Sequence, residues 1–88
     1  MKTLNLLDTI AILNSVSIDR LTLVRARISI SGLPSGQVGT IVEIYDNREE
    51  NQYLVEFADN QGCEYAMAIL KENEVLALHY ELTIAPAP

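Results

Sequence analysis

Three kinds of side chain in this sequence are capable of chemistry: a thiol, an imidazole and a set of carboxylates. Cys63 and His79 could act as nucleophile and general base if the fold brought them together. No third group that would orient the base, and no oxyanion motif, accompanies them. We therefore expect a buried or edge cysteine and a surface histidine, and the sequence predicts no catalytic residue.

The carboxylates of Glu43, Glu56 and Glu64 could converge on neighbouring strands. Such a cluster could bind a metal ion or act as an acid and base. Glutamates that alternate with apolar residues are more often the solvated face of a sheet. One His and one Cys are also too few for an ordinary zinc site. The sequence predicts no metal site and no cofactor.

The glycines of PSGQVGTIVEIY (residues 34–45) could instead cradle a phosphate, since Gly36 and Gly39 match the GxxG pattern of a KH loop. Phosphate loops lead into a helix and KH loops join two helices, whereas an apolar stretch typical of a strand follows here. We therefore predict a turn at 34–36 and place Gly39 within a strand, at a bulge or a close backbone crossing. Gly62, in DNQG, is predicted to take the positive-φ position of a hairpin turn.

The charge is distributed unevenly along the chain, whose formal net charge is −6. Residues 1–42 carry four basic and two acidic side chains, whereas residues 43–74 carry nine carboxylates and two basic side chains. Most of the molecule would repel nucleic acid or a membrane surface. Arg20, Arg25 and Arg27 form a basic group that would suit an acidic protein or a second copy of the chain, so a homo-oligomer is also predicted.

The tyrosines could line a groove for an extended peptide, although packing within the strands is the favoured interpretation. Together with the arginines they define a candidate interaction surface: Arg20, Arg25, Arg27, Tyr45, Tyr53 and Tyr65.

The elements that would position these residues follow a period of two. In residues 22–31, TLVRARISIS, apolar and polar side chains alternate, which predicts a half-buried strand. In residues 38–45, Val38 and Ile44 are expected on one face, and Ile41 and Glu43 on the other. Further strands are predicted at 8–14, 53–58, 63–70 and 75–84, with a 3₁₀ or α turn at 71–74 and a short helix as the alternative for 2–8.

Five to six short strands with at most a short helical turn predict an all-β protein, a small antiparallel barrel. We expect one domain at 1–84 and an extended tail at 85–88, where APAP contains two prolines that cannot donate to a sheet.

Four segments together resemble a family of small bacterial proteins known as domain of unknown function 4926. They are LLDTIAI, GQVGTIVEIY, YLVEFADNQGCEYAMAIL and EVLAL, and the resemblance extends from Leu6 to Leu78. It implies an SH3-like barrel and a partner encoded beside the protein, in a toxin–antitoxin or immunity context. Residues 15–33 depart from the family, because they are longer and strand-like where a short loop is expected. GQVGTIVEI also resembles the KOW element of ribosomal and transcription-factor barrels, but this chain lacks their basic loops.

The sequence thus predicts a non-enzymatic module that binds another protein. A KOW-like nucleic-acid module that uses the three arginines is the alternative, and an enzyme is a distant third. A cytoplasmic location is expected, because Cys63 is the one cysteine and no internal disulfide can form. The N-terminal residues 1–13 are interrupted by Asn5, Asp8 and Thr9, so neither a signal peptide nor a membrane span is predicted.

Overall fold

The computed structural model describes residues 4–25 and 30–78. Their regular structure consists of short strands and two 3₁₀ turns, which confirms the all-β fold class. The strands are β1 (Thr9–Ile12), β2 (Val16–Ser17), β3 (Leu21–Leu23), β4 (Gly32–Leu33), β5 (Val38–Tyr45), β6 (Gln52–Ala58), β7 (Glu64–Lys71) and β8 (Val75–Ala77), and the 3₁₀ turns are η1 (Ile18–Arg20) and η2 (Glu72–Glu74).

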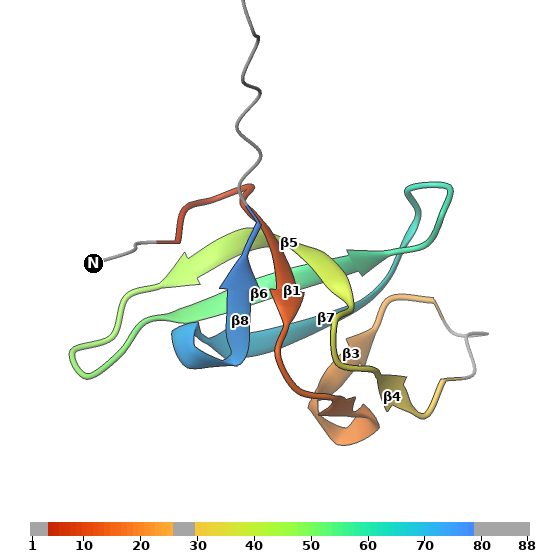
Figure 1. Cartoon of the computed structure of the whole chain (residues 1–88), viewed down its shortest axis with the longest axis horizontal. Helices are drawn as coiled ribbons and strands as arrows, with labels where there is room; N and C mark the ends of the chain where they lie inside the picture. Colours follow the sequence, from red (N-terminus) through yellow and green to blue (C-terminus); the bar gives the residue numbers. More distant parts are fainter. Residues whose placement is uncertain (1–3, 26–29, 79–88) are drawn as a thin grey trace, which may run out of the picture.

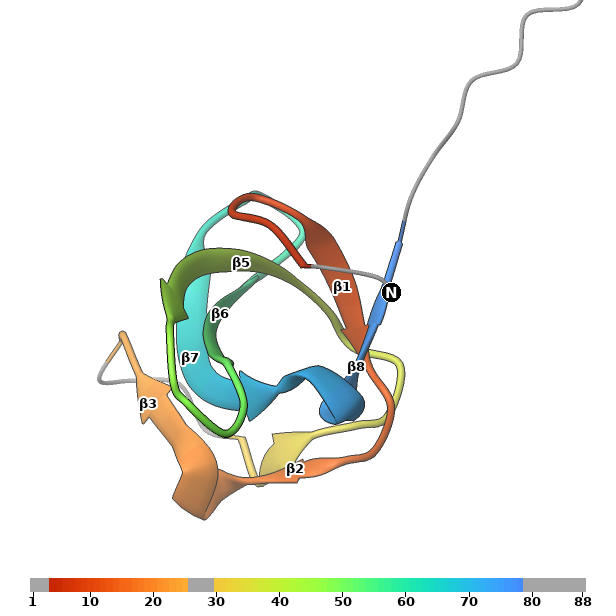
Figure 2. The ribbon, with the colours of Figure 1, turned by 90° about the vertical axis from the view of Figure 1, so that its left-hand side faces the viewer.

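Six strands form one antiparallel sheet in the order β3-β7-β6-β5-β1-β8, and β2 and β4 form a second, two-stranded sheet. The large sheet is strongly curled. Figure 2 shows β5, β6 and β7 on one side of a common centre and β1 and β8 on the other. In Figure 1, β1 and β8 lie in front of β6 and β7. The sheet is barrel-like but open, because β3 and β8 are its two ends.

The core fills the inside of this curl as one cluster of buried side chains. Strands β6 and β7 supply it by strict alternation: Tyr53, Val55 and Phe57 on β6, and Ala66, Ala68 and Leu70 on β7. The turn between the two strands has the predicted form. Asp59 Oδ1 accepts hydrogen bonds from the amides of Gln61 and Cys63 (2.9 and 3.0 Å), and Gly62 has a φ of +80°.

In strand β5 the side chains that face the core are not those predicted from simple alternation. Gly39 and Ile41 face the core, and a register shift between Ile41 and Glu43 then inserts one extra residue, so that Ile44 also packs on the core. The predicted faces are therefore wrong, because a bulge changes the phase of a strand without any change in the apolar pattern. The predicted turn before β5 is confirmed, with Gly36 at a φ of +90°.

The predicted strand over residues 22–31 is wrong in its described part. Strand β3 ends at Leu23, and the chain bends at Val24 and Arg25, although the Val24 amide still donates to the Tyr65 carbonyl (2.9 Å). Strand β4 pairs with β2 instead of continuing β3. The local alternation favoured one long strand, but the length of a strand depends on how far a neighbouring strand pairs with it. Residues 66–68 of β7 pair with β3 only as far as Leu23. Residues 26–29 lie outside the described part, and with them Arg27.

Near both ends of the described chain, the regular elements are fewer or shorter than predicted. Residues 5–8 form a turn, in which the Asp8 amide donates to the Asn5 carbonyl (3.1 Å), so the alternative helix at 2–8 is absent from its described part. The predicted turn at 71–74 is confirmed as η2. The last strand ends at Ala77, and the predicted stretch 79–84 and the tail 85–88 lie outside the described residues.

Candidate functional site

The structure does not bring the candidate nucleophile and base together within the residues it describes. Cys63 is exposed in the turn between β6 and β7, and His79 lies outside the described part. Over residues 4–25 and 30–78, no three His, Cys, Asp or Glu side chains group closely enough to hold a metal ion.

Two of the three glutamates predicted to converge do meet. The Glu64 carboxyl group hydrogen-bonds to that of Glu56, and this contact, with a smaller contribution from burial, raises the pKa of Glu56. Glu43 lies opposite Leu54 on the neighbouring strand. The result is a pair of titratable groups on the outer side of β6 and β7.

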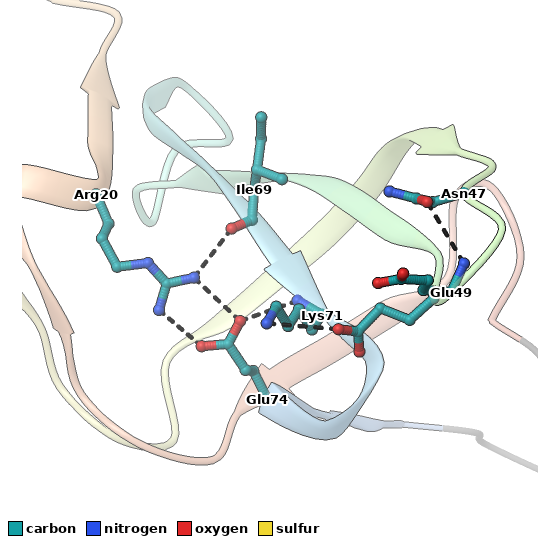
Figure 3. Close-up of polar contacts among 7 residues, drawn as sticks. Arg20, Asn47, Glu49, Ile69, Lys71 and Glu74 are labelled. Carbon is teal, nitrogen blue, oxygen red and sulfur yellow. Dashed lines mark hydrogen bonds and ion pairs between the residues drawn. The ribbon is translucent and has the colours of Figure 1, made fainter.

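Arg20 is bound within its own chain. Its Nη1 and Nη2 donate to the two carboxylate oxygens of Glu74 (2.6 and 3.0 Å), and Nη2 also donates to the Ile69 carbonyl (3.1 Å; Figure 3). This bidentate contact links η1 to η2 across the open side of the sheet. Arg20 also lines an open groove of about 530 Å³ between β2 and β4, but Glu74 already neutralises the guanidinium there.

Arg25 is bound in the same way at the other end of β3. Its Nη2 donates to Asp59 Oδ2 (2.9 Å) and to the Cys63 carbonyl (3.1 Å), and its Nε donates to the Glu64 carbonyl (3.2 Å). The guanidinium, together with the amides of Cys63 and Gln61, lowers the pKa of Asp59. Two of the three predicted basic residues are thus committed to intramolecular ion pairs.

The Arg20–Glu74 contact makes stability depend on pH. The hydrogen bond from Arg20 is the largest cause of a Glu74 pKa below its ordinary value of 4.5; burial opposes it, and the Lys71 amide adds to it (2.9 Å). A carboxyl group whose folded pKa is depressed stabilises the fold above its unfolded pKa, and this stabilisation is lost as pH falls through the folded value. Both side chains are partly exposed and water screens the pair, so we expect wild type to lose about 0.3 to 1 kcal/mol more than Glu74→Gln between neutral pH and about pH 3.

Urea unfolding at a series of pH values measures this difference. Glu49→Gln, a change of the same charge in an exposed loop carboxylate, is the control and should follow wild type. Parallel curves for wild type and Glu74→Gln over the whole acidic range would show that the contact contributes nothing to stability.

The three tyrosines of the candidate surface do not share one face. Tyr45 is exposed at the end of β5, whereas Tyr53 is a core residue with 1% exposure whose hydroxyl donates to Glu72 Oε1 (3.3 Å). Tyr65 is partly buried against the core. The predicted interaction surface is corrected here, because Tyr53 points inward and cannot contact a partner.

A different surface is formed by the outer face of β5, β1 and β8. Ala11, at the centre, pairs with Val38 on β5 and with Leu76 on β8, so the three side chains form one row across three strands. Val38 is 45% exposed and Leu76 is 52% exposed. Leu13, two residues beyond Ala11, is 45% exposed. We call Ala11, Leu13, Val38 and Leu76 the apolar face.

Another apolar side chain is exposed where the ladder of β1 and β5 begins. Leu7 has a φ of +69° and is 75% exposed, and its amide donates to the Ile41 carbonyl (2.7 Å). A left-handed conformation costs a residue with a Cβ roughly 1 to 2 kcal/mol. Strain of this kind persists only where the surroundings enforce it, and it is concentrated at functional sites.

Sequence reasoning missed the apolar face. Its residues come from segments that are far apart in the chain, and strands β5, β1 and β8 are neighbours in space but not in sequence. No local signal indicated this face, because the predicted alternation placed Val38 with Ile44 on the side of the strand opposite Glu43.

No helix in the described part of the chain is long and apolar enough to cross a membrane. Among curated proteins and among solved structures, none matches the chain significantly. The family model described as "Domain of unknown function (DUF4926)" matches residues 6–77, which span β1 to β8 and include the whole apolar face. This match covers most of the sequence, and the chain therefore belongs to the DUF4926 family.

Proposed function

We propose that this protein is a non-enzymatic module that binds another protein on its apolar face. The observation that carries the proposal is the row Val38–Ala11–Leu76, in which two exposed apolar side chains, Val38 and Leu76, flank the partly exposed Ala11 on three adjacent strands. Contiguous exposed apolar surface on a small protein is characteristic of an interaction site. Leu7, held outward in a strained conformation, supports the same proposal.

The chemistry of the face suits a protein partner. Complete burial of a Val or Leu side chain contributes about 1.5 to 3 kcal/mol, and these side chains are already about half buried, so each would add roughly 1 kcal/mol on docking. Among the described strands, β8 is the last of the sheet, and its outer edge beside the face would take a strand from the partner. We also propose a cytoplasmic location, because a single exposed cysteine stays reduced there. The partner is proposed to be encoded by a gene beside that of this protein.

The KOW-like alternative receives no support from Arg20 and Arg25, the two described members of its arginine group. Arg20 and Arg25 would have to leave Glu74 and Asp59 before they could contact phosphates.

Ala11→Gln tests the proposed function. Glutamine at the centre of the row is bulky and polar but uncharged, so it should obstruct docking while the buried neighbours Ile10 and Ile12 keep the strand in place. In this experiment, wild type and the variant each carry a tag and are used as bait in lysate of the native cell. We expect the variant to retain at least about tenfold less of the proteins that wild type captures, which corresponds to a loss of about 1.4 kcal/mol in binding free energy.

Ile69→Gln is the matched control. Ile69 is as exposed as Val38 and Leu76, but it lies on the outer side of β7, which β6 and β5 separate from β1. Its capture profile should equal that of wild type. Thermal unfolding shows whether wild type and Ala11→Gln are both folded. If both are folded and capture the same proteins in equal amounts, the proposed function is refuted.

A further inference from the structure

The described residues form a strongly acidic molecule with few unpaired cations. They carry eleven carboxylates and four basic side chains: Arg20, Arg25, Arg48 and Lys71. Three of these four are held in ion pairs, Arg20 with Glu74, Arg25 with Asp59, and Lys71 with Glu50 (3.4 Å). The potential around the molecule is therefore dominated by unpaired carboxylates.

The apolar face is uncharged and has an acidic border. Its three strands contain one charged residue, Glu43 on β5. Asp8 immediately precedes β1, and neither Asp8 nor Glu43 is held in an ion pair within the described part of the chain. A partner that docks on the row Val38–Ala11–Leu76 thus brings the rim of its own interface close to carboxylates.

We infer that the partner is a basic protein, with an apolar patch bordered by Lys and Arg. This inference rests on the proposed function and adds the charge of the partner. Like charges across an interface are unfavourable, whereas complementary rim charges steer and orient the encounter. A second copy of this chain carries the same net charge of −6 and is opposed by the same field. This basic partner differs from the acidic one expected from the three arginines, two of which, Arg20 and Arg25, are paired with Glu74 and Asp59.

A pair of substitutions at one position measures the sign of the partner's charge. Leu76→Lys and Leu76→Glu remove the same exposed apolar side chain and replace it with a long charged one. Both should weaken binding to the proteins that wild type captures from the native lysate. Against a basic rim, the Lys variant should bind roughly three- to tenfold more weakly than the Glu variant, and added salt should reduce this difference. Ile69→Lys and Ile69→Glu, on the outer side of β7, should bind as wild type does.

The outcomes separate the inference of a basic partner from the proposed protein-binding function. A lower affinity of the Lys variant, with captured proteins that have a basic isoelectric point, supports the inference. A lower affinity of the Glu variant, or equal losses for both, overturns the basic partner but leaves the protein-binding function in place. The inference of a basic partner is also overturned if the main protein that wild type retains, and that both Leu76 variants lose, is an untagged copy of this chain. Wild-type capture by both variants overturns the inference and the proposed function together. Thermal unfolding of every variant establishes that a loss of capture reflects the face and not the fold.

Discussion

Gly39→Val is expected to lower the free energy of unfolding by about 3 kcal/mol or more, the largest effect we predict. Gly39 faces the core from β5, and a Cβ placed on it would lie 2.6 Å from Val55 Cγ1 and 2.9 Å from the Phe57 ring. Both neighbours are fully buried, so neither can move without displacing other core side chains. The strand preference of valine, worth at most about 1 kcal/mol, cannot offset this overlap.

Urea unfolding with a two-state fit measures this loss. A domain of this size has roughly 4 to 13 kcal/mol of stability in total, so Gly39→Val could leave little folded protein, and Gly39→Ala provides a milder form of the same test. Val55→Ala in the Gly39→Val background should restore part of the loss, because it removes the closest atom. Thr40→Val, at the next position but partly exposed, should change stability little. A Gly39→Val protein as stable as wild type would show that β5 does not pack against β6 in this way.

The second largest effect is expected at Gly32 in β4. Gly32 has a φ of +150°, and a Cβ there would lie 2.6 Å from the Val16 carbonyl oxygen, a backbone atom of the paired strand β2. Gly32→Ala therefore combines an unfavourable backbone conformation with a clash that no side-chain rotation relieves. We expect a loss of about 2 to 3 kcal/mol.

Gly36→Ala is the matched control, because Gly36 also has a positive φ but has no atom within 4 Å of the added Cβ. It should lose only the backbone contribution, roughly 1 kcal/mol. The difference between the two variants in urea unfolding isolates the contact between β2 and β4. Equal losses at the two glycines would contradict the close pairing of these strands.

Local sequence signals were sufficient for the strands that form hairpins with their neighbours. Alternation and turn residues placed β5, β6 and β7 within a residue or two of their bounds, because β5 pairs with β6 and β6 with β7, Gly36 lies in the turn before β5, and Gly62 lies in the turn between β6 and β7. The 3₁₀ turn η2 was equally visible as a short polar run between apolar ones.

The rest depended on contacts between residues far apart in the sequence. The Arg20–Glu74 and Arg25–Asp59 pairs join residues separated by 54 and 34 positions, and no periodicity reports such distances. For the same reason the arginines were interpreted as a free basic surface, and Tyr53 was included in the candidate interaction surface although packing within the strands was the favoured interpretation. The apolar face required knowledge that β1 lies between β5 and β8, which only the sheet order supplies.

The central claim, that a protein partner docks on the outer face of β5, β1 and β8, is tested most directly by NMR. The ¹⁵N-labelled chain is titrated with the purified protein that wild type captures and Ala11→Gln does not, and backbone amide shifts are followed. The account predicts that the largest changes occur at Ala11, Leu13, Val38 and Leu76, with little change at Leu54 and Ile69 on the outer side of β6 and β7. Changes concentrated around Leu54 and Ile69, with the amides of the apolar face unmoved, would contradict it.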